Sequence, residues 1–162
     1  MKNVPNKIIV HHSAFAQASS QLLQINQWHK DREFTLSSLG YYVGYHYLIT
    51  RDGTITATRK IDEEGCHTIG ENTSSIGVCL EGNFDNDIPT GKQEQMLGKL
   101  LVSLCEANSI PYTSIEPHRH YKATSCYGQK LADNFAKVVC LKEKIDQLQK
   151  ALSQLTTPSC PE

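Results

Sequence analysis

Three residues with metal-binding side chains stand out in this chain of 162 residues: His11, His118 and Cys126. His11 lies in the segment VHHSA at the end of an apolar run, and the other two share the downstream segment PHRHYKATSCYG. Two imidazoles and a thiolate suit a zinc ion and leave its fourth tetrahedral position open to water. An open site of this kind is catalytic in character, because a structural zinc site would require a fourth protein ligand.

Spacing alone leaves two interpretations open, a metal site or unrelated histidines and cysteines. The chain contains neither an HExxH motif nor a paired CxxC motif, whose spacing would indicate a metal by itself. His12 also competes with His11 for the first ligand position. Since neighbouring residues on a strand point to opposite faces, only one of the pair can reach the metal, and the other is expected in the core or behind the site.

Several short segments that follow one another along the chain provide a second line of evidence beside the candidate metal ligands. The segments are VHHSA (10–14), QWHK (27–30), GYHY (44–47), RDGT (51–54), SIGV (75–78), HR (118–119) and TSC (124–126). The series resembles the type-2 N-acetylmuramoyl-L-alanine amidases, a family that includes amidase-type phage lysozymes and the peptidoglycan recognition proteins. The resemblance covers about residues 7–135, and it is specific because the segments follow the family's order with the metal ligands in place.

The resemblance implies a zinc amidase that holds one zinc ion per chain through His11, His118 and Cys126. The implied reaction is hydrolysis of the amide bond between the lactyl group of N-acetylmuramic acid and the L-alanine of the peptide stem. Tyr45 matches the family's catalytic tyrosine, whose phenol would hydrogen-bond the reacting water or the oxyanion. Tyr47 shares its strand face by alternation, so alternation does not choose between the two tyrosines.

Two further site residues follow from the resemblance. Thr124 stands where the phage lysozyme branch has a lysine and many recognition amidases have a threonine, so it would offer a neutral catalytic hydroxyl instead of a positive charge. His67 matches a family position at the edge of the substrate cleft. We expect His67 to bind the peptide stem or to support a metal ligand, with a plain surface histidine as the alternative.

The resemblance favours a phage or prophage endolysin, an enzyme that degrades the bacterial cell wall. The nearest alternative is an intracellular amidase that recycles muropeptides. A non-catalytic peptidoglycan-binding module is the alternative from another class. Binding members of the family typically lack the cysteine ligand, so the presence of Cys126 argues against that alternative.

Composition narrows the class of protein and its partners. A hydrophobic content of 39%, a charged content of 20% and a net charge of −1 are typical of one globular domain without a basic surface for nucleic acid. No apolar run approaches the roughly 20 residues that span a bilayer, and the N-terminus MKNVPNKIIVHH lacks the apolar core of a signal peptide. We therefore expect cytoplasmic synthesis, with no nucleic-acid partner and no membrane span. Peptidoglycan or muropeptides as partners are what the resemblance implies.

The six cysteines have different environments in the pattern. Cys79 and Cys105 lie among apolar residues and are expected in the core as small hydrophobic side chains. Cys160 lies in a proline-flanked tail and is expected to be an exposed thiol. The pattern leaves Cys66 and Cys140 undecided.

Hydrophobic periodicity predicts an α/β protein, a single-domain mixed sheet flanked by helices, which is also the fold that the resemblance implies. A β-branched run predicts a strand over 7–12, and Ser19 or Ser20 is expected to cap the helix that follows. A loop over 31–44 is expected to shape a groove. The other expected elements are a hairpin of 45–50 and 54–59, a strand over 75–81, a capped helix over 90–107, a short strand and ligand loop within 109–128, and a helix over 131–155.

The last helix carries an apolar stripe with heptad spacing, formed by Val138, Leu141, Ile145, Leu148, Leu152 and Leu155. We expect the stripe to pack on its own domain and the protein to be a monomer, with self-association through 138–155 as the alternative. The expected division is a catalytic domain over 1–135, the amphipathic helix over 136–156 and a tail over 157–162.

Overall fold

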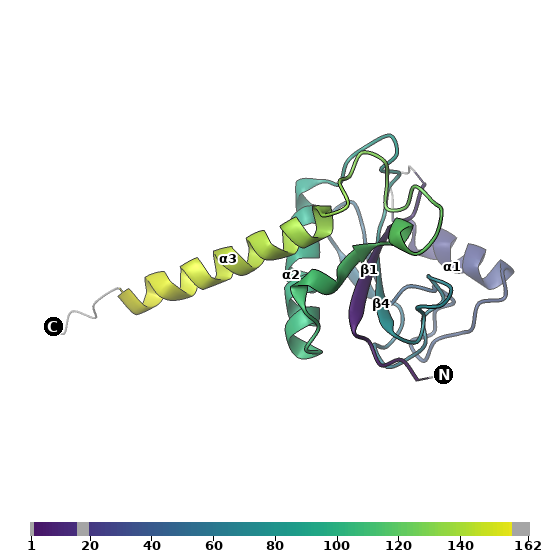
Figure 1. Cartoon of the computed structure of the whole chain (residues 1–162). Coiled ribbons are helices and arrows are strands. Elements are labelled where there is room, and N and C mark those ends of the chain that lie inside the picture. The colour runs from purple at the N-terminus through teal and green to yellow at the C-terminus, as the bar shows by residue number, and fades with distance from the viewer. Residues whose placement is uncertain (1, 16–19, 157–162) are drawn as a thin grey trace.

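The computed structural model describes residues 2–15 and 20–156, and its strands form one sheet in the order β3-β2-β4-β1-β5 (Figure 1). Helices lie on both sides of this sheet. The strands are β1 Lys7–His12, β2 Tyr47–Ile49, β3 Ile55–Ala57, β4 Ser75–Leu80 and β5 Ile115–Pro117. The helices are α1 Leu22–Asp31, α2 Gly91–Ala107 and α3 Phe135–Thr156, with short 3-10 turns η1 Tyr112–Ser114 and η2 His118–His120.

The sheet is mostly parallel, with one antiparallel strand at its edge. β1 pairs in parallel with β4 and β5, and β4 pairs in parallel with β2, whereas β3 is antiparallel to β2. β1 therefore lies inside the sheet, and its KIIVHH sequence is buried on both faces, as continuous apolar runs are in parallel sheets. The predicted mixed sheet flanked by helices is confirmed.

Apolar side chains fill the space on both sides of the sheet. On one side, Ile8 and Val10 of β1 belong to the larger core, which α2 and α3 cover. On the other side, Leu48 and Cys79 form a smaller core with Ile25 of α1. Alternate residues of each strand therefore face different helices, and α1 lies across the sheet from α2 (Figure 1).

Local sequence alone accounts for both ends of α2. The side chain of Thr90 accepts a hydrogen bond from the Gln93 backbone N–H, and the Gln93 side chain accepts one from the Thr90 N–H. These reciprocal bonds are the capping box expected from the sequence. Asn108 closes the helix with a backbone bond to Leu104, so the predicted span of this helix is confirmed.

The start of α1 differs from the sequence expectation. Ser19 lies outside the described residues, and the N-cap position is Gln21 rather than Ser20. The Gln21 backbone N–H donates to Glu81 Oε1 at 2.7 Å. A carboxylate from the residue after β4 thus takes the favourable position for negative charge at a helix N-terminus. The cap comes from a distant segment, which no local pattern predicts.

The hairpin strands are shorter than predicted. β2 begins only at Tyr47, and β3 covers only Ile55–Ala57. The side-chain hydroxyl of Thr50 donates to Asp52 and to the Thr54 carbonyl within the turn. These local bonds extend the turn at the expense of the strands.

α3 also begins later than predicted, at Phe135 instead of Leu131. The backbone carbonyls that precede it bind side chains of the loop that carries Cys126. Arg119 donates to the Leu131 carbonyl at 2.6 Å, and the Tyr127 hydroxyl lies 3.0 Å from the Ala132 carbonyl. Tertiary contacts therefore hold this segment outside the helix.

The expectation that the apolar stripe of α3 packs on its own domain is wrong. Ala136 and Cys140 are buried against the domain, but the stripe lies on another face of the helix. All six stripe residues are exposed, from 37% at Val138 to 84% at Leu155. Figure 1 shows why, since α3 leaves the body of the protein and extends beyond α2.

In the part of the chain that the structure describes, no helix combines the length and the apolar character needed to cross a membrane. The five cysteines in these residues are all free thiols. Cys79 and Cys105 are buried in the core as predicted, and Cys140 is buried as well. Cys160 lies outside the described residues.

Candidate metal site and its cavity

His11, His118 and Cys126 converge at one edge of the sheet, although they lie far apart in the sequence. One candidate ligand atom from each lies within 4.8 Å of the others. His11 Nδ1 is 3.7 Å from Cys126 Sγ, and the ring centres of His11 and His118 are 4.4 Å apart. Among residues 2–15 and 20–156, no other set of three histidine, cysteine or acidic side chains is placed to hold a metal ion.

Strand register explains this convergence. β1 and β5 are parallel neighbours, with Val10 opposite Pro117. His11 and His118 each follow by one residue, so both lie at the carboxyl edge of the sheet, where open α/β sheets bind ligands. Cys126 arrives from the loop after η2, and its Sγ accepts a hydrogen bond from the His12 backbone N–H at 3.4 Å.

Residues 118–128, which include both downstream ligands, are here called the ligand loop. Arg119 holds this loop closed through both its backbone and its side chain. Its N–H donates to the Cys126 carbonyl at 2.8 Å, and its guanidinium binds the Gly128 carbonyl at 2.8 Å and Asp133 at 2.5 Å. Since these bonds join both ends of the loop, they keep Cys126 close to His118.

The three side chains fit a zinc ion. Tetrahedral ligands at the usual Zn–N and Zn–S lengths lie about 3.5 Å apart, close to the separation of His11 Nδ1 and Cys126 Sγ, which is 3.7 Å. Burial, reinforced by neighbouring histidines, lowers the pKa of His11 well below its usual value, and burial also lowers the pKa of His118. Both imidazoles are therefore neutral at pH 7, the form that binds metals.

The pKa of the Cys126 thiol shifts upward, in the opposite direction to those of the two histidines. Burial raises the pKa of Cys126 to about 12 in the metal-free chain. A bound divalent cation would reverse this preference, because a coordinated thiol loses its proton. Metal binding at this site would therefore release a proton.

The ring of His12 turns toward Phe84 on the other face of β1, as alternation predicts, although the residue also borders the cavity. Its Nδ1 accepts a hydrogen bond from the Phe84 backbone N–H at 3.0 Å, and its ring packs on the Phe84 ring. His12 therefore belongs to the opposite side of the sheet from His11 and supports the larger core.

His67 lies directly behind His11, so the alternative of a plain surface histidine is wrong. Its Nδ1 is 3.1 Å from His11 Nε2 and 3.1 Å from the Thr68 hydroxyl. The contact occupies the ring nitrogen of His11 that faces away from Cys126 and so orients His11 Nδ1 toward the site. Gly77 of β4 makes room, because a Cβ there would lie 2.6 Å from the His67 ring.

Thr68 is a site residue that the sequence analysis missed. Its hydroxyl contacts His67 and lies 3.5 Å from His11 Nε2. Its backbone N–H, like that of His67, is bound by the Asn72 side chain. A threonine next to a histidine carries no recognisable signal, so only the folded turn reveals this contact.

The structure separates the two tyrosines that alternation left equivalent, so the expectation of a shared face is wrong. Tyr45 packs with the smaller core on the α1 side, with its ring centre 5.1 Å from that of His11. Tyr47 packs against the larger core on the other side. The alternation does not extend to Tyr45 because this residue precedes β2. Burial raises the pKa of Tyr45 well above its usual value, so its hydroxyl stays protonated.

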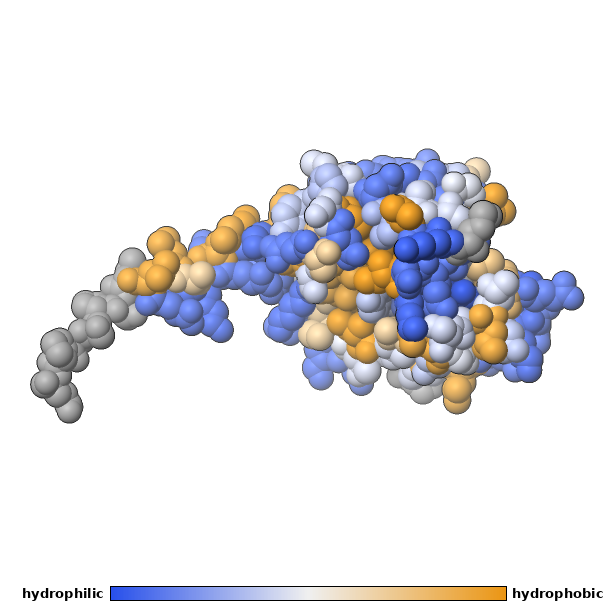
Figure 2. All heavy atoms as spheres, turned by 90° about the horizontal axis from the view of Figure 1, so that it is seen from below, coloured by the Kyte–Doolittle hydropathy of each residue, from blue (hydrophilic) through white to orange (hydrophobic). Residues whose placement is uncertain are grey.

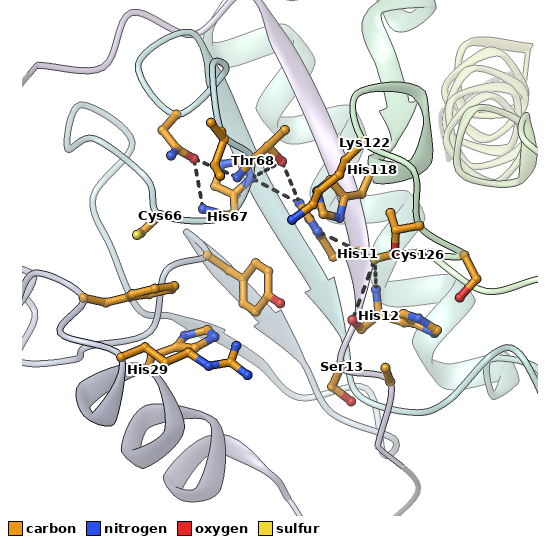
Figure 3. Close-up of a pocket in the computed structure, with 18 residues that line it drawn as sticks. His11, His12, Ser13, His29, Cys66, His67, Thr68, His118, Lys122 and Cys126 are labelled. Atoms are coloured by element: carbon orange, nitrogen blue, oxygen red, sulfur yellow. Dashed lines mark hydrogen bonds between the residues drawn. The ribbon is translucent and has the colours of Figure 1, made fainter.

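A cavity of about 640 Å³ opens over these residues on the α1 side of the sheet (Figure 3). His11, His118 and Cys126 meet at one end of it, and His67 with Thr68 forms the adjoining wall (Figure 3). The loop expected to shape a groove contributes Arg32 and Phe34 to the lining, as predicted. The other lining residues include Tyr45, Ile69, Lys122 and Thr124.

Thr124 lines the cavity but is tied to the loop backbone. Its hydroxyl accepts a hydrogen bond from the Cys126 N–H at 3.3 Å. Lys122 also lines the cavity and is exposed. The side chain of Thr124 can therefore hold Cys126 in place as well as face a ligand in the cavity.

Two other histidines near the cavity have structural partners. His29 Nδ1 accepts from the Gly44 N–H at 3.0 Å, and its ring stacks on Phe34. His46 accepts from the Gly77 N–H at 3.0 Å and lies 3.0 Å from the Glu63 carbonyl. Both histidines therefore fix backbone segments and are not metal ligands.

Replacing Gly128 with alanine should disrupt the end of the ligand loop. Gly128 has φ +114°, and a Cβ there would lie 2.3 Å from Phe84 Cβ and 2.6 Å from the Phe84 carbonyl oxygen. Backbone strain and the clash together should lower the free energy of unfolding by about 2–4 kcal/mol. Urea unfolding followed by circular dichroism measures this change.

Gly70 provides the matched control for this substitution. It has a similar positive φ of +88°, but a Cβ there meets no atom within 4 Å. Gly70→Ala should therefore cost only the backbone strain, about 1–2 kcal/mol. Equal losses in the two variants would contradict the close contact between the ligand loop and Phe84.

Comparison with known proteins agrees with this geometry. The family model Amidase_2, N-acetylmuramoyl-L-alanine amidase, matches residues 1–129. The endolysin of Klebsiella phage KP32 is 40% identical over 124 residues, 72% of this chain and 74% of that protein. A peptidoglycan-recognition protein of Drosophila simulans is 30% identical over 137 residues, 80% of this chain and 72% of that protein. The solved N-acetylmuramoyl-L-alanine amidase LysC from Clostridium intestinale URNW superimposes with a TM-score of 0.70 at 28% identity, covering 91% of this chain and 87% of that chain.

Proposed function

The chain belongs to the N-acetylmuramoyl-L-alanine amidase family, and we propose that it is a zinc-dependent enzyme that hydrolyses the bond between N-acetylmuramic acid and L-alanine in peptidoglycan. The observation that carries this proposal is the cluster of His11, His118 and Cys126 at the end of an open cavity. Three protein ligands and an accessible fourth position are the donor set of catalytic zinc sites. A zinc ion held there would supply a Lewis acid that polarises the scissile carbonyl and activates water near neutral pH.

We assign the stabilisation of the oxyanion to Tyr45. Its ring lies beside His11, and its raised pKa keeps the phenolic proton available for donation. A neutral donor held in a buried wall needs little reorganisation when negative charge develops on the substrate oxygen. Thr124 would add a weaker hydroxyl contact from the ligand loop.

His67 is proposed to act on both sides of its ring. The 3.1 Å contact of its Nδ1 with His11 Nε2 supports a role in orienting His11, and the ring also lines the cavity. A peptide stem in the cavity would therefore pass close to His67. This placement supports its assignment as a substrate-binding residue.

We propose an endolysin role, with the bacterial cell wall as the place of action. The relative from phage KP32 is an endolysin and aligns with most of both chains. The buried Cys126 beside both histidines supports an enzyme over a binding module, because binding members of the family typically lack this ligand. Muropeptide recycling inside the cell is the alternative that a substrate comparison distinguishes.

We propose that residues 1–135 form the catalytic domain and that 136–156 form an appended helix, followed by a tail over 157–162. The family model ends at residue 129, and every proposed site residue precedes α3. The first part of α3 still covers the larger core through Ala136 and Cys140. The first turns of α3 therefore belong to the core of the catalytic domain, whereas its later turns are exposed to solvent.

Digestion of purified peptidoglycan tests the proposed reaction. New N-terminal L-alanine should appear without new reducing sugar ends, and the activity should disappear with a chelator and return with zinc. Reducing ends would indicate a glycosidase, and amino groups of other stem residues would indicate an endopeptidase. A higher rate on polymeric wall than on isolated muropeptides would support the endolysin role over recycling.

A further inference from the structure

The distal part of α3 is a helix without the support of a protein core. Residues 145–155 are all exposed, whereas nearer the body Glu143 faces Gly98 of α2 and Lys144 pairs with Glu106. Isolated helices shorter than about 12–15 residues are marginal in water. A helical segment of this length is therefore expected to gain stability by covering its apolar face.

The apolar face has the shape of a coiled-coil seam. Ile145, Leu148, Leu152 and Leu155 follow one another at steps of four and three residues, and each is more than half exposed. Figure 2 shows apolar side chains along one side of the projecting helix and polar side chains along the other. A stripe limited to two positions per heptad is narrower than the face of a helix that packs on a globular core, and it matches pairing with one other helix.

The same stripe is poorly suited to a membrane surface. Helices that lie in a lipid interface present a wide apolar face, usually with aromatic residues. Residues 145–155 contain no aromatic residue, the stripe is flanked by the polar Gln149 on one side and the small Ala151 on the other, and Lys150 lies on the opposite face. These features favour a helix of matching shape as the occupant.

We infer that α3 pairs with α3 of a second copy of this chain, in antiparallel orientation, through the stripe from Ile145 to Leu155. This dimer replaces the monomer expected from the sequence. In this arrangement Leu148 of each copy packs on Leu152 of the other, and Ile145 packs on Leu155. The two catalytic domains then lie at opposite ends of the helix pair.

The helix dipoles favour the antiparallel orientation, because each helix end then lies beside the oppositely charged end of its partner. Lys137 lies outside the paired stripe and binds Glu116 of its own domain at 2.8 Å, so it does not enter the seam in either orientation. In the antiparallel pair the central flanking positions are Gln149 and Ala151, each facing its own equivalent, so no like charges meet there. The small side chain of Ala151 also allows the helices to approach closely.

The expected interface is small. An exposed Leu or Ile side chain contributes roughly 60–120 Å² of apolar surface when buried, so four from each copy contribute roughly 500–1,000 Å². Interfaces below about 1,200 Å² are typically weak. We therefore expect a reversible dimer that forms over a micromolar range of concentration.

Sedimentation velocity across about 1–300 µM of the full chain tests this pairing, with Leu148→Asp and Gln147→Asp as the matched variants. Both positions are exposed on α3, and both substitutions add one negative charge. Neither should therefore change the thermal unfolding of the isolated chain. We expect a concentration-dependent dimer for the wild type and for Gln147→Asp, and a monomer at every concentration for Leu148→Asp.

Small-angle scattering of the wild-type dimer tests the orientation, since opposite domains give an elongated particle and adjacent domains a compact one. A wild-type monomer throughout the range, a trimer, or a dimer that persists in Leu148→Asp would overturn the inference. A compact dimer would overturn the antiparallel arrangement. A monomer that binds anionic phospholipid vesicles through α3 would assign the stripe to a membrane surface instead.

Discussion

Zinc content should fall from one ion per chain to far below one when Cys126 is replaced with alanine, and peptidoglycan hydrolysis should fall with it. The substitution removes the anionic ligand and leaves the two neutral imidazoles of His11 and His118. Loss of a residue that only supports a metal ligand typically costs about 10–100-fold in affinity, so loss of the ligand itself should cost more than about 100-fold. Metal analysis after gel filtration and competition with a chelating dye measure this change.

Cys105→Ala is the control for the loss of a buried thiol. Cys105 lies in α2 within the larger core, away from the cavity. Both variants should unfold with a loss of about 1 kcal/mol, the order expected for a small buried group. Only Cys126→Ala should lose zinc. A Cys126→Ala protein that keeps one zinc ion at unchanged affinity would disprove the assigned ligand set.

Tyr45→Phe should lower the turnover rate by about 10²–10³, the effect of removing one donor to an oxyanion. The variant keeps the ring that packs in the smaller core beside His11, so the fold and the zinc content should be retained. Because the missing hydroxyl acts mainly in the transition state, kcat should fall more than KM changes. Steady-state kinetics on a soluble muropeptide separate the two parameters.

Tyr47→Phe and Thr124→Ala are the comparison variants for the turnover of Tyr45→Phe. Tyr47 packs against the larger core on the other side of the sheet, so its hydroxyl should be dispensable for turnover. Thr124 lines the cavity with a neutral hydroxyl that also binds the Cys126 N–H, and its loss should cost less than that of Tyr45. Wild-type turnover in Tyr45→Phe would shift the role to a backbone donor or to another cavity residue.

Much of the fold could be predicted from local patterns because each pattern reports one element. The KIIVHH run predicts β1, and the Thr90–Gln93 pair predicts the start of α2, since both depend on neighbouring residues only. Alternation along β1 correctly places His11 and His12 on opposite faces. The same rule fails for Tyr45 and Tyr47, because the chain is not yet a strand at Tyr45.

Elements that depend on distant partners could not be predicted in this way. Glu81 caps α1 from across the fold, and carbonyl contacts with Arg119 and Tyr127 delay the start of α3. These hydrogen-bond partners lie outside the terminal turns of the helices, so the residues around each end do not predict them. Long-range hydrogen bonds therefore decide the boundaries that short-range propensity leaves open.

The sequence by itself determined the family, the candidate metal ligands and the periodicity of each helix and strand, because these depend on residue types and their order. Only the tertiary structure decided that parallel strands bring His11 beside His118, that His67 stands behind His11, and that Tyr45 rather than Tyr47 reaches the cavity. It also decided that the stripe of α3 is exposed. The physical reason is that periodicity shows which residues share a face, whereas the packing of the whole chain determines what, if anything, covers that face.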